Sequence, residues 1–223
     1  MKIQLLADPE YSAAFSAYLE KIEEIELTTE KPDLVFDVMF LNPQRKLSEI
    51  SKLGGATSNI ISNTLTVSIT SVQQAAGLTA ECIGMPIFPH YFERQKTIEF
   101  ALPFGKEINK QQADSFLSLL GKDGEQIQDA IAGVFPRTLA MIVNEAAFAV
   151  QESVAVPEDI DVAMKLGTNY PKGPLAWCDE IGAKAIVAVL DALSEEYGAD
   201  RYRVAPLLRR YAEAGMRFIP GET

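Results

Sequence analysis

Apolar and polar positions alternate in short blocks along the first part of the chain. Residues 3–6 are mostly apolar and predict a strand. A helix is predicted next by residues that recur at helical spacing, namely Tyr11, Phe15, Tyr18 and Ile22. The stretch KIQLLADPEYSAAFSAYLEKIEEIELTT (2–29) therefore looks like strand, turn, helix and strand, which together make a βαβ unit.

The same alternation continues through the first half of the chain. Further strands are predicted for DLVFDVMF (33–40), NIISNT (59–64) and residues 82–88, and helices for PQRKLSEISKL (43–53) and 108–120. A GKDGEQ turn (121–126) follows the last of these helices. Alternating strands and helices imply a mostly parallel sheet, so we expect an α/β domain over residues 1–130.

The pattern then changes to helices alone. RTLAMIVNEAAFAVQESVA (137–155) has a wide apolar face, and Pro157 begins a helix that Gly167 is expected to cap. Two or three further helices are predicted by PLAWCDEIG, AKAIVAVLDALSEEYG and APLLRRYAEAG, each of which closes on a glycine. We therefore expect an all-helical domain over residues 131–223.

Composition narrows the classes of partner. The 223 residues carry 31 acidic against 20 basic side chains, a net charge of −11, which argues against nucleic acid or an anionic membrane surface. Cys82 and Cys178 both lie in apolar segments, as expected in a reducing compartment. No apolar run suits a signal peptide or a membrane span, so we expect a cytoplasmic protein.

The helical half carries a resemblance. NEAAFAVQESVAVPEDIDVAMKLGTNYPKGPLAWCDEIG, followed by RYRVAPLLRR, closely resembles the C-terminal domain of the 3-hydroxyacyl-CoA dehydrogenases of fatty-acid β-oxidation and related pathways. Upstream, SNTLTVSIT, IGM and KTIE resemble that family's S-N-T-S-S, G-M-H-F-F-N-P and K-L-V-E stretches. The resemblance implies a Rossmann-like domain, here shortened, followed by a helical domain that forms a homodimer and helps to enclose acyl-CoA.

The resemblance also implies hydride transfer between the substrate and NAD, with a histidine base oriented by a glutamate. However, the expected diphosphate turn reads ADPEY and lacks glycine. Asp8 is placed to cap the following helix with its carboxylate, Pro9 has no N–H, and Glu10 adds a second negative charge. Glu30 could imitate the family's ribose ligand, but without the glycine turn we expect no cofactor, and no metal either.

The family's catalytic positions are also altered. Aligned from SNT, Pro86 stands where the histidine belongs, and Glu99 matches the orienting glutamate. His90, the one histidine in the chain, lies four residues further on, about 13 Å if the segment is extended. His90 and Glu99 are therefore the catalytic candidates, with the alternative that His90 is a packing residue and Glu99 a solvated or capped carboxylate.

The substrate-binding positions differ as well. Leu65 replaces the family's serine, with Thr66 as the nearest hydroxyl, and Pro136 replaces its asparagine beside Arg137. Asn63, Thr66 and Arg137 remain the candidate substrate-binding residues.

Three functional hypotheses follow from these substitutions. The first is a diverged, homodimeric member without NAD-dependent activity that binds an acyl-CoA-like ligand or a partner in its interdomain cleft. The alternative is an active dehydrogenase of fatty-acid metabolism with a rebuilt His90/Glu99 site and altered NAD binding. The third is a heterodimer with a full-length homologue through the helical half.

Overall fold

Seven strands form one sheet in the computed structural model, which describes residues 1–53, 59–77, 79–106 and 110–219. They are β1 (Lys2–Leu6), β2 (Glu26–Leu27), β3 (Leu34–Asp37), β4 (Asn59–Asn63), β5 (Glu81–Met85), β6 (Thr97–Ala101) and β7 (Asp123–Ile127). Their order in the sheet is β2-β1-β3-β4-β5-β6-β7. The chain therefore moves to one side of β1 first and to the other side afterwards, and this change of direction is a topological switch point.

All neighbouring strands run parallel except β5 and β6, which pair antiparallel at Gly84 and Ala101. The predicted mostly parallel sheet is confirmed. In register, Ile3 of β1 faces Leu27 of β2 on one side and Leu34 of β3 on the other. The carboxyl ends of β1 and β3 thus lie side by side, with Leu6 opposite Asp37.

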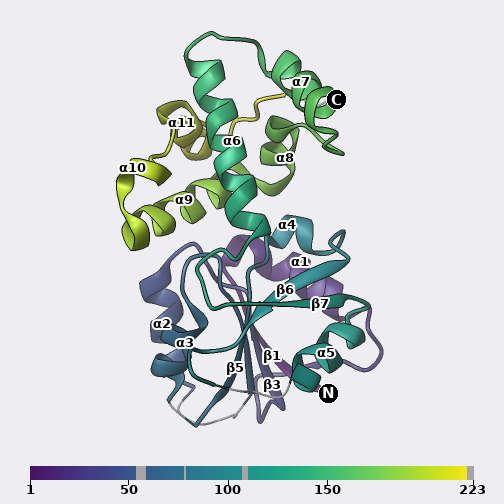
Figure 1. Cartoon of the computed structure of the whole chain (residues 1–223). Helices are drawn as coiled ribbons and strands as arrows, with labels where there is room; N and C mark the ends of the chain where they lie inside the picture. The colour runs from purple at the N-terminus through teal and green to yellow at the C-terminus, as the bar shows by residue number, and fades with distance from the viewer. Residues whose placement is uncertain (54–58, 78, 107–109, 220–223) are drawn as a thin grey trace. The chain divides into compact units, whose positions relative to one another are not determined.

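Helices cover both faces of the sheet (Figure 1). The helices that alternate with these strands are α1 (Pro9–Leu19), α2 (Pro43–Ser51), α3 (Ile69–Ala76), α4 (Pro89–Phe92) and α5 (Lys110–Leu119). Because side chains alternate along a strand, β3 sends Val35 into a core cluster with Ile50 of α2 and Val72 of α3, and Phe36 to the opposite face. There Phe36 packs against Phe15 of α1 and Phe116 of α5, with ring centroids 6.0 and 5.3 Å away.

The predicted GKDGEQ turn is wrong, because residues 123–127 form strand β7. This strand pairs with β6 along its whole length, from Asp123 opposite Thr97 to Ile127 opposite Ala101. Its side chains are half-exposed or exposed, so an edge strand of this kind lacks the apolar alternation that marks inner strands. The start of α5 expected at Ile108 lies outside the described residues.

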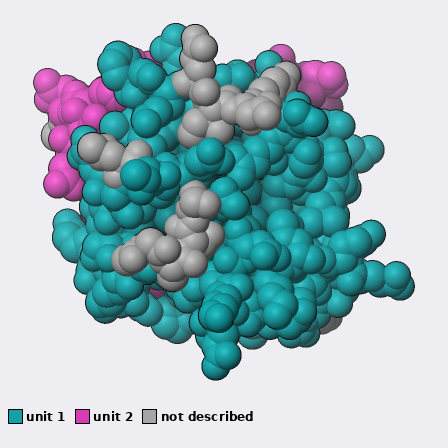
Figure 2. Space-filling view, turned by 90° about the horizontal axis from the view of Figure 1, so that it is seen from below, with its two compact units in different colours: residues 1–134 teal, residues 135–223 magenta. Residues whose placement is uncertain are grey.

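Residues 1–134 and 135–223 form two compact units (Figure 2). The boundary expected at 130/131 falls in the loop that ends the first unit. The second unit consists of α6 (Phe135–Gln151), α7 (Pro157–Thr168), α8 (Pro174–Ile181), α9 (Ala183–Tyr197), α10 (Ala199–Tyr202) and α11 (Pro206–Ala214). No helix of the described residues is long and apolar enough to cross a membrane.

The helices of the second unit end at the glycines predicted as caps, with one exception. Gly182, Gly198 and Gly215 follow α8, α9 and α11 with positive φ, as predicted. Gly167 is not a cap: α7 continues to Thr168, and Asn169 takes the left-handed conformation at φ 56° and ψ 32°. Asparagine is the residue that most readily replaces glycine in this conformation, so a glycine two residues earlier is not needed as the cap.

Candidate functional site

The carboxyl ends of β1 and β3 meet at the switch point, where Rossmann-like sheets bind their ligands. In this chain Asp8, which follows β1, is buried there with 3% of its surface exposed. Its Oδ2 atom accepts hydrogen bonds from the backbone N–H of Phe40 at 2.9 Å and of Leu41 at 3.1 Å. The side chain of Asp8 thus lies across the crevice, and its carboxylate accepts hydrogen bonds from the backbone amides that face it.

The prediction that Asp8 caps α1 with its carboxylate is wrong. Asp8 does occupy the position before the helix, and its backbone carbonyl accepts the N–H of Tyr11 and Ser12. However, within the described residues its side chain makes no capping bond to α1. Pro9, at the first position of the helix, has one fewer N–H to satisfy, whereas the buried amides of the loop after β3 need an acceptor.

An aromatic group fills the space beside this carboxylate. The ring of Tyr11 packs against Phe40 and His90, with centroids 5.4 and 4.9 Å apart. Tyr11 is 3% exposed, and burial raises the pKa of its phenol, with Glu10 and Asp8 adding to the shift. We call Tyr11, Phe40 and His90 the aromatic plug. The plug and the acidic residues together do not fit a diphosphate at the switch point.

Glu99 lies beside Pro86, as the alignment predicts. A Cβ atom added to Gly133 would come within 2.3 Å of Glu99 Oε2 and 2.6 Å of Pro86 Cγ, so the two side chains converge on this glycine. Glu99 Oε2 accepts the N–H of Val134 at 2.7 Å. The glutamate therefore binds a backbone amide next to the proline that replaces the family's histidine.

His90 lies in a different setting from Glu99. It belongs to the helical turn α4 and contacts Tyr11 of α1 in the aromatic plug. The spacing of about 13 Å from Pro86 assumed an extended segment throughout. In the structure Phe88 is extended, and α4 begins at Pro89, so His90 already lies in the helical turn. His90 contacts Tyr11 of α1, whereas Glu99 binds the turn at Gly133, so the described part of the chain does not join the two candidates as a dyad.

Asn63 and Thr66 are buried, with 1% and 6% of their surfaces exposed. Asn63 Oδ1 accepts the N–H of Leu65 at 3.1 Å and of Ile87 at 3.3 Å, and its Nδ2 donates to the carbonyl of Ile87 at 2.9 Å. Thr66 Oγ1 donates to the carbonyl of Phe40 at 2.6 Å. Both side chains thus hold the loops around the switch point, and their role in substrate binding stays a prediction.

Arg137, the third predicted substrate-binding residue, belongs to the helical unit. It lies near the amino end of α6, and its Nη2 atom donates to the hydroxyl of Tyr197 at 3.2 Å. Its guanidinium carbon lies 4.8 Å from the centroid of the same ring. This contact with an exposed tyrosine does not test the predicted role of Arg137 in substrate binding.

A buried ion pair beneath the switch point was not found from the sequence. Lys46 of α2 and Asp37 of β3 are both fully buried and bonded to each other. Ser62 Oγ donates to Asp37 Oδ2 at 2.5 Å, and Lys46 Nζ donates to the carbonyl of Met39 at 2.9 Å. Burial lowers the pKa of Lys46, and the Asp37 carboxylate opposes that shift. The available signal was that Lys46 and Ile50 share one helix face, which turns toward the core.

A polar hollow of about 510 Å³ lies beside the plug, between α1 and the residues that follow β2. Ser12 and Ser16 line one side, and Thr28, Thr29 and Glu30 line the other. Glu30, the predicted imitator of a ribose ligand, therefore borders an open hollow. In the described parts of the chain, no three His, Cys, Asp or Glu side chains group to hold a metal ion.

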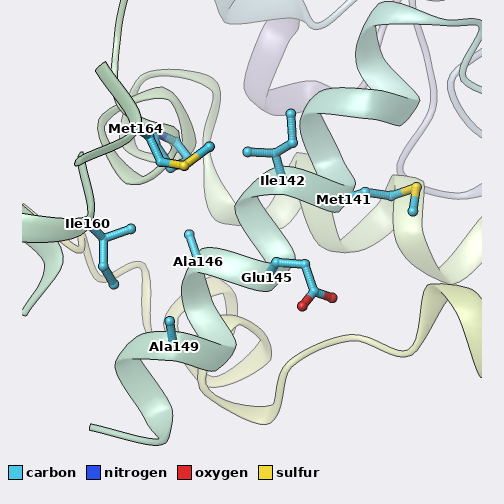
Figure 3. A pocket seen from close by; sticks show the side chains of 8 residues that line it. Met141, Ile142, Glu145, Ala146, Ala149, Ile160 and Met164 are labelled. Atoms are coloured by element: carbon cyan, nitrogen blue, oxygen red, sulfur yellow. The ribbon is translucent and has the colours of Figure 1, made fainter. Parts of the chain in front are cut away.

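The helical unit has an apolar pocket of about 460 Å³ on its surface (Figure 3). Ile142 and Ala146 of α6 face Ile160 and Met164 of α7 across it, and Glu145 is the charged residue in its lining. On the same helix α7, Val162 and Leu166 are exposed, and Leu166 shows 83% of its surface. The pocket and these exposed side chains give the helical unit an apolar surface on α6 and α7.

The chain is similar to proteins of known name in both sequence and fold. The model of the 3-hydroxyacyl-CoA dehydrogenase C-terminal domain matches residues 134–217. The 3-hydroxyadipyl-CoA dehydrogenase of Escherichia coli is 46% identical over 102 residues, which are 46% of this chain and 22% of that protein. A probable 3-hydroxybutyryl-CoA dehydrogenase of Deinococcus radiodurans is 34% identical over 191 residues, 82% of this chain and 67% of that protein.

A similarly named protein of Bacillus subtilis is 35% identical over 159 residues, 70% of this chain and 54% of that protein. The chain thus spans between 22% and 67% of the length of these three relatives.

Among solved structures, the (S)-3-hydroxybutyryl-CoA dehydrogenase of Ralstonia eutropha superimposes with a TM-score of 0.75 at 22% identity, over 96% of this chain and 94% of that chain. The 3-hydroxybutyryl-CoA dehydrogenase of Escherichia coli superimposes with a TM-score of 0.73 at 19% identity, over 95% of this chain and 51% of that chain. These structures confirm the predicted fold class, a shortened Rossmann-like sheet domain followed by a helical domain.

Proposed function

The chain belongs to the 3-hydroxyacyl-CoA dehydrogenase family, and from this premise we propose that it binds acyl-CoA-like ligands without performing NAD-linked hydride transfer by itself. The observation that carries this proposal is the Asp8 carboxylate, which accepts the N–H of Phe40 and Leu41 at the switch point. A bound diphosphate would have to displace this carboxylate and leave it beside its own negative charge. Burying two like charges together is strongly unfavourable.

The absence of the family's base supports the same proposal. Pro86 holds the place of the histidine and cannot move a proton, while Glu99 binds the N–H of Val134. His90 packs in the aromatic plug. General acid–base catalysis needs the base within hydrogen-bond reach of the proton that it takes, and an orienting carboxylate bonded to that base.

The second candidate function is an active dehydrogenase of fatty-acid metabolism, and the comparisons favour it over a protein without activity. Five relatives with 32% to 46% identity are named as dehydrogenases of 3-hydroxybutyryl-CoA or 3-hydroxyadipyl-CoA. In this case His90 and Glu99 would form the rebuilt site. The hollow at Glu30 would then take part of a dinucleotide bound in an altered manner.

Calorimetric titrations of the purified protein with NADH and with acetoacetyl-CoA separate the two candidates. We expect acetoacetyl-CoA to bind and NADH to give no response, and no oxidation of NADH when both are present. Binding of NADH, together with turnover that is lost in His90→Ala, would overturn the first candidate and establish the second. A matched control is Glu23→Gln, an exposed residue away from the switch point.

We also propose that the protein forms a homodimer through the helical unit. The apolar pocket between α6 and α7 and the exposed Val162 and Leu166 supply the surface. Light scattering after gel filtration should give twice the chain mass, and Leu166→Glu should give the monomer. Lys165→Glu, next to it on the same helix, should leave the dimer intact. A wild-type monomer that pairs only with a full-length homologue would favour the heterodimer instead.

A further inference from the structure

The segment after α11 folds back onto the helical unit. Gly215 ends α11 with a φ of 63°, and Met216 donates its N–H to the carbonyl of Tyr211 at 3.0 Å. The segment then stacks the ring of Phe218 on the ring of Tyr211, with a centroid distance of 4.4 Å. Phe218 is buried, with 4% of its surface exposed. Residues 217–219, which we call the strap, therefore lie against the helices.

A carboxylate of α8 holds the main chain of the strap. Asp179 accepts the N–H of Phe218 through Oδ1 and that of Ile219 through Oδ2, both at 2.8 Å. Its side chain is only 4% exposed, so these bonds are shielded from water. Arg217 Nε lies 3.9 Å from the same carboxylate, but the arginine is exposed and adds little. The strap is thus bound by two backbone amides and one aromatic ring.

Each of these contacts can be made by another extended segment. Backbone N–H groups belong to every residue except proline, so Asp179 recognises a main chain and not a particular sequence. Tyr211 supplies the selective part, because it stacks on an aromatic ring. We call Asp179 and Tyr211 the docking site. It fits an extended segment with one aromatic residue, and in the structure Phe218 and Ile219 of the same chain occupy it.

The strap is anchored more lightly than the helices beneath it. Opening it breaks the two bonds to Asp179 and the ring contact with Tyr211, and Met216 before it is already exposed. Helix α9, by contrast, buries a long row of apolar side chains, Leu190 among them. Segments with few buried contacts open at a much lower free energy than core helices. The strap can therefore leave while the helices remain folded.

We propose that the strap is releasable: it opens while the helices stay folded, and the vacated docking site binds the strap of a second copy of the chain. That segment carries the two amides and the aromatic ring in the observed spacing. Within one chain the strap has an effective concentration in the millimolar range, so it occupies its own site unless it is weakened. All these contacts lie in the helical unit, so the strap does not rest on the function proposed above.

The first test is amide hydrogen exchange of the full chain, followed by NMR. We expect the N–H groups of Phe218 and Ile219 to exchange at least about a hundred-fold faster than that of Leu190. Phe218→Ala should speed exchange at Ile219 by a further factor of about ten or more, because the buried ring is lost, while α9 stays protected. Phe104→Ala, at an exposed ring, is the matched control and should change neither rate. Equal rates at Ile219 and Leu190 would overturn the proposal.

The second test supplies the strap in trans. The probe is the peptide GMRFI, which has the sequence of residues 215–219, with both ends blocked. We expect it to bind Phe218→Ala at least about ten-fold more tightly than the wild type, whose site is filled by its own strap. The analogue GMRAI should not bind, and neither should GMRFI to the double variant Phe218→Ala/Asp179→Ala.

Two results of this titration would contradict strap exchange. They are the absence of saturable binding of GMRFI to Phe218→Ala, and equal binding of GMRFI and GMRAI. Unchanged binding to the double variant would show that Asp179 does not hold the segment, and would overturn the proposed site as well. If the double variant fails to fold, the comparison of the two peptides on Phe218→Ala still decides whether the site recognises the aromatic ring.

Discussion

Asp8 and Phe40 are joined across the end of the sheet by a hydrogen bond of 2.9 Å, although 32 positions separate them in the chain. The bond connects the turn after β1 to the loop after β3 and is buried on both sides. It fixes the two loops that border the switch point, and it places a negative charge there. One residue thereby links the two loops at the place where Rossmann-like sheets bind their ligands.

Removing this carboxylate should cost stability. In Asp8→Ala the buried N–H groups of Phe40 and Leu41 lose their acceptor, and we expect a loss of about 2–4 kcal/mol in the free energy of unfolding. Asp8→Asn keeps one acceptor oxygen and should cost about half as much. Urea denaturation measures both, with Glu23→Gln as a control within about 0.5 kcal/mol of the wild type. Equal stability of the Ala and Asn variants would contradict this account.

Asn63 should act on stability rather than on ligand affinity. Asn63→Ala leaves backbone groups of Leu65 and Ile87 unpaired in the core, so we expect a loss of about 2–4 kcal/mol. Thr66→Val, which loses one bond to Phe40, should cost about 1–2 kcal/mol. Thr97→Val, at an exposed position of β6, is the control. If acetoacetyl-CoA binds less tightly to the folded variants while their stability is unchanged, the predicted substrate-binding role gains support instead.

The ion pair of Lys46 with Asp37 should show strong coupling. Lys46→Met leaves the Asp37 carboxylate buried without its cation, and we expect a loss of about 3–5 kcal/mol. Adding Asp37→Asn removes the charge and should recover at least about half of that loss. A double-mutant cycle by urea denaturation measures the coupling, and strictly additive losses would contradict it. Lys52→Met, on the exposed surface after the same helix, should change stability by about 0.5 kcal/mol or less.

Cys82 should lower the stability of the protein at alkaline pH. Burial raises the pKa of its thiol from the ordinary value of 9.0 to about 12. The unfolded chain therefore loses the thiol proton near pH 9, whereas the folded chain keeps it to about pH 12. Across this window the folded state binds more protons, so its stability falls as pH rises, by up to about 1.4 kcal/mol per pH unit.

Urea denaturation at several pH values between about 8 and 11 measures this slope. Cys82→Ala should be less stable than the wild type near pH 8 and should show a shallower fall as the pH rises, so that the two profiles approach each other. Cys178 remains in both proteins and serves as a common background, since burial also raises its pKa. Parallel pH profiles of the two proteins would show that Cys82 does not titrate as described.

The inner strands could be predicted because they are buried on both faces and read as apolar runs, as LVF does in β3. Strand β7 could not, because its exposed side chains are polar and only its backbone pairing defines it. The position of Asp8 between the first strand and the first helix was predicted correctly. Its partners were not, because Phe40 and Leu41 are brought to it by the sheet and not by local sequence.

The candidate site was predicted in part for a similar reason. Alignment with the family placed Glu99 next to Pro86, and their convergence on Gly133 agrees with it. The Lys46–Asp37 pair was not predicted, because a lysine on a helix is normally exposed. Only the three-dimensional packing of α2 shows that Lys46 is buried. Contacts between distant segments are the part that a single sequence does not supply.

The shortness of β2 has a consequence for self-association. β2 pairs with β1 only at Lys2 and Ile3, so among the described residues the outer backbone edge of β1 from Gln4 to Leu6 has no strand beside it. An open edge can template the addition of a foreign strand and so begin aggregation. Hydroxyl groups and the charge of Glu30 border this edge, and a charged side chain at a sheet edge disfavours the addition of a foreign strand because it would have to be desolvated.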